Sequence, residues 1–164
     1  MRYGSKRRRS WTGAEKVAGA TAGLAGGAAY AAAMAADLRL FRYNADDYLL
    51  LGGALGLRPM PASRVGKCIH VLNSAVLGIL FERLAYRRLP FSPAVNGAVF
   101  ATIENAALYP VFIVEHLHPL IRRGDLPSYR TGAAFSQSVI RHVAYGAVTG
   151  WTLDSLLKRW ARKR

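Results

Sequence analysis

The sequence predicts an all-α integral membrane protein, a polytopic bundle of four transmembrane helices with one interfacial or re-entrant segment between the first two. Hydrophobic residues make up 52% of its 164 residues, and they gather in long apolar runs. Lys and Arg number 23 against 9 Asp and Glu, a formal net charge of +14, and most of them lie at the ends and between the runs. Basic loops between apolar helices are typical of membrane proteins.

Residues 1–13 form a basic tail that ends near an aromatic side chain. Arg7, Arg8 and Arg9 precede Trp11, and basic residues beside an aromatic are typical of an anchor on anionic cytoplasmic lipid. An arm that binds nucleic acid is the competing interpretation. We expect no nucleic-acid partner, because the chain lacks a basic stripe interleaved with aromatics on a recognisable module.

The first predicted span, residues 15–36, consists mainly of Ala and Gly. Gly19, Gly23 and Gly27 recur every four residues, which places three positions without side chains on one helical face. This face predicts close packing against another helix, although an alanine-rich composition alone would also contain such residues.

Residues 37–64 form a mixed loop that contains an apolar segment at 48–57. Ten residues are too few to span a bilayer as a helix, so this segment is expected to be interfacial or re-entrant. Asp46 and Asp47 precede it and favour a helix N-terminus, with a cation site as the less favoured alternative.

The second predicted span covers residues 65–86 and carries a polar stripe. His70, Asn73 and Ser74 are spaced i, i+3 and i+4, so they share one side of the helix. Such a stripe should face protein rather than lipid.

The third predicted span, residues 94–117, has Glu104 and Asn105 at its middle. A carboxyl group near the membrane midplane requires neutralisation or a partner. Near its end, Glu115, His116 and His118 suggest a metal site only weakly, because side chains two residues apart on a helix point in different directions. We therefore predict no metal site.

The fourth predicted span covers residues 132–157 and is followed by a basic tail at 158–164. Arg141 and His142 lie inside it, and Gly146 and Gly150 form a second close-packing pair. Trp151 and Trp160 suit the membrane interface.

The distribution of basic residues predicts the orientation of the bundle. With four spans, 14 Lys and Arg residues fall on the side of the two termini and 8 on the other. The positive-inside rule then places both termini in the cytoplasm.

A pair between Glu104 and Arg141 is expected, because both residues lie at similar depths on antiparallel helices. The pair would belong to a buried polar cluster whose members are Glu104, Asn105, Arg141, His142, His70 and Asn73. This cluster either fixes helix packing or serves as a proton, ion or ligand site.

Further features of the sequence are the Gly/Ala-rich first helix, the string Phe81-Glu82-Arg83, Pro110 and the string from His142 to Gly146. In this layout the chain resembles the YagU-type family of small bacterial inner-membrane proteins. The resemblance implies four spans in a bacterial inner membrane and transfers no catalytic residue.

These patterns favour an accessory or scaffold subunit of a larger membrane complex, or a homo-oligomer. The alternative is a small proton, ion or solute transporter that uses Glu104, Arg141 and the histidines. The sequence has no Ser/His/Asp arrangement, HExxH, phosphate-binding glycine loop or CxxC, so no enzymatic activity is expected. No cofactor is predicted, although a bound lipid or pigment is compatible with the apolar helices.

Overall fold

A computed structural model describes residues 13–41 and 43–162, and within these residues the chain is helical with no strand. The predicted all-α class is therefore confirmed. The elements are α1 (Gly13–Leu40), α2 (Asp47–Gly53), α3 (Pro59–Leu84), α4 (Pro93–Leu108), the 3-10 helix η1 (Tyr109–Leu117), α5 (Pro119–Arg122) and α6 (Gly132–Ala161).

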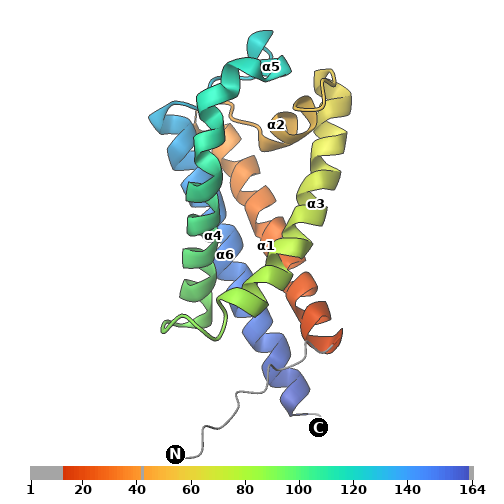
Figure 1. The fold of residues 1–164 in the computed structure, drawn as a ribbon, viewed down its shortest axis with the longest axis vertical. Helices are drawn as coiled ribbons and strands as arrows, with labels where there is room; N and C mark the ends of the chain where they lie inside the picture. Colours follow the sequence, from red (N-terminus) through yellow and green to blue (C-terminus); the bar gives the residue numbers. More distant parts are fainter. Residues whose placement is uncertain (1–12, 42, 163–164) are drawn as a thin grey trace, which may run out of the picture.

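Four long helices run along the length of the molecule, and the two described chain ends lie together at one end (Figure 1). Helix α6 packs against both α1 and α4, and α1 also packs against α3. At the other end, α2 packs against α3, and α5 lies above it (Figure 1). Helices α3 and α4 therefore form the two outer members of the bundle, and they diverge toward the end that carries α2.

The contact between α1 and α3 is made by the glycine series of α1. A Cβ atom added at Gly23 would lie 2.1 Å from the carbonyl oxygen of Ser74 and 2.9 Å from the Cα atom of Gly78. A Cβ atom at Gly19 would lie 3.0 Å from the carbonyl oxygen of Gly78, and Gly27 lies against the side chain of Ser74. The two backbones approach this closely because neither has a side chain between them.

The contact between α4 and α6 has the same basis. A Cβ atom at Gly97 would lie 1.9 Å from the carbonyl oxygen of Gly146, and one at Gly150 would lie 1.9 Å from that of Pro93. Both glycine series therefore lie at helix contacts inside the bundle.

The third predicted span is not one continuous α-helix. Helix α4 ends at Leu108, and residues 109–117 continue as η1 with a kink at Val114 (φ −101°, ψ 18°). Pro110 explains the change, because proline has no backbone N–H to donate to the preceding turn and its ring crowds that turn.

Helix α1 is longer than predicted, and the segment after it is shorter. It continues to Leu40 and so carries Asp37 on its last turns. The apolar segment expected at residues 48–57 is helical only up to Gly53, in α2, and then turns. The N-cap of α2, Asp46, accepts hydrogen bonds from the backbone N–H groups of Tyr48 and Leu49. The acidic pair thus lies at a helix N-terminus.

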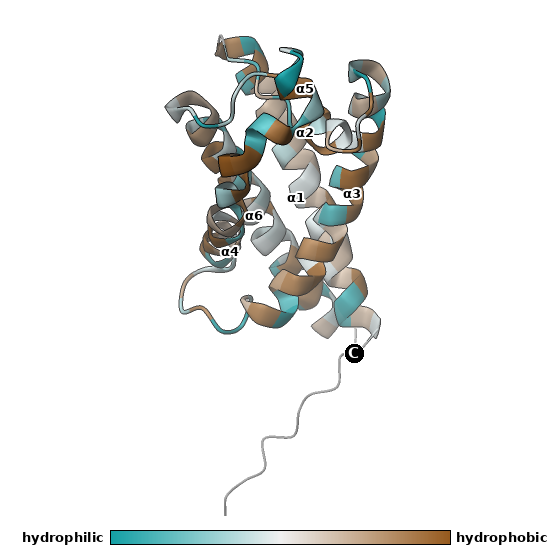
Figure 2. Cartoon of the chain, turned by 45° about the horizontal axis from the view of Figure 1, so that its top comes forward, coloured by the Kyte–Doolittle hydropathy of each residue, from teal (hydrophilic) through white to brown (hydrophobic). Residues whose placement is uncertain are grey.

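Three helical stretches are long and apolar enough to cross a membrane, namely Gly13–Leu40, Pro59–Leu84 and Pro93–Leu117. Figure 2 shows α3 and α4 largely in the colours of hydrophobic residues, whereas α1 is paler. The fourth predicted span corresponds to α6, which has 30 residues but is not apolar enough to be counted with the other three. It packs against both α1 and α4, and part of its polar character comes from the buried residues Gln137, Arg141 and Thr149.

Substitution of Gly23 by Ala tests the close contact between α1 and α3. The added methyl group meets backbone atoms that cannot rotate away, so we expect the unfolding free energy to fall by about 1–3 kcal/mol. Gly132→Ala is the matched control, because a Cβ atom there has nothing within 4 Å. Thermal unfolding in mild detergent measures both variants, and equal melting temperatures would contradict the contact.

Candidate functional site

The most enclosed charged side chain in the described structure is Arg141 on α6, which is 1% exposed. Its Nε and Nη2 atoms donate to the two carboxylate oxygens of Asp37 on α1, both at 2.6 Å. Its Nη1 atom donates to Asp47 on α2 at 2.6 Å and to the carbonyl oxygen of Ala45 at 2.7 Å. Arg141 therefore joins three helices through a bidentate pair and a second carboxylate.

The expected pair of Glu104 and Arg141 does not form. Asp37 was assigned to a loop, but α1 extends past it and carries it to the level of Arg141. Asp47 reaches the same guanidinium because α2 folds back against the bundle. Two carboxylates already surround Arg141, and Glu104 lies instead beside His142, with 3.3 Å between its Oε2 atom and the imidazole Nε2 atom.

Two tyrosines complete the surroundings of Asp47. The Tyr30 hydroxyl donates to its Oδ2 atom at 2.5 Å, and the Tyr129 hydroxyl donates to its Oδ1 atom at 3.1 Å. Burial raises the pKa of the Tyr129 hydroxyl well above its ordinary value, and the negative charge of Asp47 raises it further. Tyr129 therefore stays protonated and remains a donor, so both oxygens of Asp47 keep their partners.

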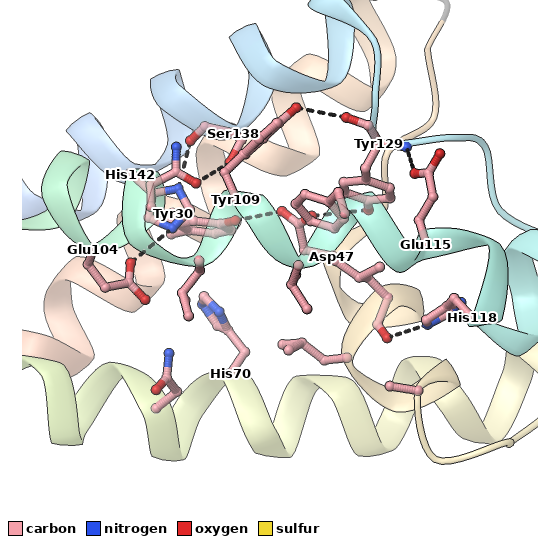
Figure 3. Close-up of a pocket in the computed structure, with 18 of the residues that line it drawn as sticks. Tyr30, Asp47, His70, Glu104, Tyr109, Glu115, His118, Tyr129, Ser138 and His142 are labelled. Carbon is pink, nitrogen blue, oxygen red and sulfur yellow. Dashed lines mark hydrogen bonds and ion pairs between the residues drawn. The ribbon is translucent and has the colours of Figure 1, made fainter.

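A cleft of about 530 Å³ opens between α3 and the α4–η1 segment. The two outer helices meet nearer the loop that joins them, where the ring centroids of Phe81 and Phe100 lie 5.6 Å apart. Its inner wall comes from α1 and α6 and includes Tyr30 and His142. Helix α2 lines it at the end where α5 lies, with Leu50 and Leu51. Figure 3 shows the labelled polar side chains of the cleft, with Glu104 and His142 on one side and Asp47 between them and His118.

The sequence-predicted polar residues meet along this cleft, apart from Arg141. His70, Asn73, Glu104, Asn105 and His142 all line it. The Oδ1 atom of Asn105 accepts a hydrogen bond from the Ser138 hydroxyl at 2.7 Å, and the Nε2 atom of His70 lies 3.1 Å from the carbonyl oxygen of Gly27. Three helices thus contribute the polar side chains predicted for one cluster, with Arg141 held in a separate network behind Asp47.

The residues considered for a metal site do not converge. Glu115 accepts hydrogen bonds from the Ser128 hydroxyl and from the backbone N–H of Tyr129, both at 2.6 Å. His118 lies 2.9 Å from the carbonyl oxygen of Leu50, while His116 is exposed. Within residues 13–41 and 43–162, no group of three or more His, Cys, Asp or Glu residues is arranged to hold a metal ion.

The predicted interface residues lie in different settings. Trp151 is 66% exposed on α6, whereas Trp160 packs against the buried cluster that contains Ala18 and Leu153. The predicted lipid anchor formed by Arg7, Arg8, Arg9 and Trp11 lies outside the described residues.

Several residues of the site were missed by sequence reasoning, although their spacing gave a signal. On α6, Gln137, Arg141 and Tyr145 recur every four residues and are all buried. On α1, Tyr30 and Asp37 are seven residues apart and both buried. A seven-residue spacing returns to the same helical face, so this polar face of α1 could have been predicted together with its glycine face.

These features define an all-helical protein with three stretches apolar enough to span a membrane and, between its two outer helices, a largely apolar cleft that holds a few polar side chains. The chain belongs to the DUF6789 family, a family of unknown function whose model matches residues 14–163. No curated protein and no solved structure matches it.

Variants of the Arg141 network should differ in stability in a defined order. Arg141→Met leaves the buried Asp37 and the partly buried Asp47 without their cation, and loss of one partner from a buried pair costs about 3–5 kcal/mol. Asp37→Asn should cost less, because Arg141 keeps Asp47. Unfolding by denaturant in detergent measures both losses.

Asp125→Asn is the control for this series, because Asp125 pairs with Arg123 at the surface, where the two side chains are 38% and 45% exposed. An exposed pair contributes about 0–1 kcal/mol. A loss for Arg141→Met no larger than that of the control would show that the network does not hold the helices together.

Proposed function

We propose that this protein is an integral membrane protein with four spans and both termini in the cytoplasm, and that it binds a small, mainly apolar ligand in the cleft between α3 and α4. The single observation that carries the proposal is the cleft itself, in which largely apolar walls surround the facing Glu104 and His142 side chains. Ligand sites in proteins commonly combine apolar walls with a few polar groups in this way.

The exposure of apolar side chains supports the membrane location. Only 22% of the most apolar window of α3 and 17% of that in the α4–η1 segment are buried within the protein. Their exposed residues include Leu72, Ile103 and Val111, each at least 60% exposed. Such continuous apolar surface suits contact with lipid rather than water. Because α6 lies beside α1 and α4, it would cross the same bilayer with them, as the fourth span.

The setting of the cleft supports ligand entry from the bilayer. Its two outer walls are helices with exposed apolar faces, and Leu108 and Leu117 of the α4–η1 wall both line the cleft and remain mostly exposed. An apolar molecule dissolved in the lipid would therefore reach Glu104 and His142 without crossing a polar surface.

The arrangement of the glycines favours this proposal over an accessory or scaffold role. That role rested on glycine faces free to dock onto another protein. Gly19 and Gly23 lie against α3, and Gly146 and Gly150 lie against α4, so these faces are already occupied within one chain.

Native mass spectrometry after extraction from the membrane in mild detergent tests ligand binding. We expect the wild-type protein to carry a small bound molecule that is lost in Asn73→Trp, because Asn73 is an exposed lining residue whose enlargement extends into the cleft. Val76→Trp is the matched control, since Val76 lies on the same helix, is 52% exposed and does not line the cleft.

Identical bound masses in the wild type and in Asn73→Trp would contradict binding in the cleft. Copurification of a larger assembly at fixed stoichiometry, with no small molecule bound, would favour the accessory-subunit role instead.

A further inference from the structure

The charge of the cleft is opposite to that of the chain. The chain has a formal net charge of +14, yet the residues that line the cleft include no Lys or Arg. They include three carboxylates, those of Asp47, Glu104 and Glu115. Arg141 lies behind Asp47, where it is paired with two carboxylates. The cleft therefore disfavours an anionic ligand.

Two of these carboxylates are held by the protein itself. Asp47 receives hydrogen bonds from Arg141, Tyr30 and Tyr129, which together occupy both of its oxygens. Glu115 receives one hydrogen bond on each oxygen, from Ser128 and Tyr129. Neither carboxylate is available to become the main partner of a ligand, so both serve structure.

Glu104 differs from the other two. Its Oε2 atom lies 3.3 Å from the Nε2 atom of His142 but makes no well-formed hydrogen bond within the described structure. The Nδ1 atom of His142 lies 2.7 Å from the carbonyl oxygen of Ser138, and because a carbonyl only accepts, Nδ1 carries a hydrogen. One further proton, placed on either His142 Nε2 or Glu104, makes the pair electrically neutral.

Aromatic rings surround this pair. The ring of Tyr30 lies between the two histidines, with centroid distances of 4.9 Å to His70 and 5.2 Å to His142. Tyr109 and Phe112 of η1 also line the cleft, and their ring centroids lie 5.0 Å apart. Aromatic faces attract cations as well as apolar groups. The site thus combines an incompletely bonded carboxylate, aromatic walls and an apolar entrance.

We propose that the ligand of this cleft is a lipophilic cation, a monovalent ammonium or phosphonium with apolar substituents, whose charge is held beside Glu104. This inference rests on the proposed function, since it names the chemical class of the ligand. The carboxylate supplies the charge complement, and the aromatic and aliphatic walls hold the substituents.

A cation beside Glu104 and a further proton on this pair would supply the same single positive charge, so the two exclude each other. With the cation bound, the site holds a carboxylate, a neutral imidazole and the cation. The other ionisable or polar side chains that line the cleft near this pair include His70, Asn73 and Ser74 on α3, Asn105 on α4, Tyr30 on α1, and Ser138 and Tyr145 on α6. Because protons compete with the cation, the affinity falls as the pH falls.

Calorimetric titration of the detergent-purified full chain with tetraphenylphosphonium tests the proposal. Tetraphenylborate, titrated separately in sodium buffer, has the same shape and the opposite charge. We expect one saturable site for the phosphonium and none for the borate. Glu104→Gln removes the charge and keeps the shape of the side chain, so it should weaken phosphonium binding by about tenfold to a hundredfold.

Two control variants separate the contribution of Glu104 from general effects. Asp125→Asn removes one negative charge at the surface, outside the cleft, and should leave the affinity for phosphonium unchanged. Asn73→Trp should abolish binding, whereas Val76→Trp should preserve it. If Glu104→Gln does not fold, the decrease in wild-type affinity at lower pH carries the test.

The outcomes distinguish this inference from the proposed function. Three results would overturn the assignment of the ligand as a cation: equal binding of the borate, an unchanged affinity in Glu104→Gln, or an affinity independent of pH. The cleft would remain a ligand site if Asn73→Trp still abolishes binding. Absence of phosphonium binding also overturns the assignment of the ligand as a cation. If, in addition, Asn73→Trp alters no bound molecule in native mass spectrometry, the proposed function fails as well.

Discussion

The buried network around Arg141 is the constraint on which the rest of the structure depends. Arg141 on α6 binds Asp37 near the end of α1 and Asp47 at the start of α2, so one guanidinium fixes where the first two helices lie relative to the last. Desolvation of these charges is costly, and the bidentate geometry and the added donors from Tyr30 and Tyr129 offset that cost. Because α2 is held in this position, it packs against the beginning of α3 and lines one end of the cleft.

The glycine contacts explain why the cleft lies between α3 and α4. Gly19, Gly23 and Gly27 bring α1 against α3, and Gly146 and Gly150 bring α6 against α4. Since α1 also packs against α6, each outer helix packs mainly against an inner helix, and the two outer helices meet through Phe81 and Phe100 nearer their connecting loop. The space left between them collects Glu104, His142 and the aromatic rings. The same close packing that stabilises the bundle therefore creates its binding site.

The sequence predicted the all-helical class and the residues that line the cleft better than it predicted their partners. The helical spacing of His70, Asn73 and Ser74 indicated a side that faces protein, and all three line the cleft. The pairing of Glu104 with Arg141 was wrong, because depth was estimated from helix ends and Asp37 was assigned to a loop. The break at Pro110 follows from proline itself, an effect that the prediction of one continuous span did not apply. The folding back of α2 depends on tertiary contacts, such as that between Gly52 and Ala62, which no local pattern specifies. Whether α6 crosses a bilayer, as its predicted span requires, stays a prediction.

The most direct test of the central claim, a cleft open to the bilayer between α3 and α4, is methyl NMR of the protein in lipid nanodiscs with dissolved oxygen as a paramagnetic probe. Oxygen concentrates in the acyl chains and enhances the relaxation of methyl groups that it reaches. Leu72 is 68% exposed, Leu153 is fully buried, and Leu77 lines the cleft. Our account predicts strong relaxation enhancement at Leu72 and Leu77 and little at Leu153. Protection of Leu77 to the level of Leu153 would show that the outer helices close on each other in the membrane, and this result would contradict the account.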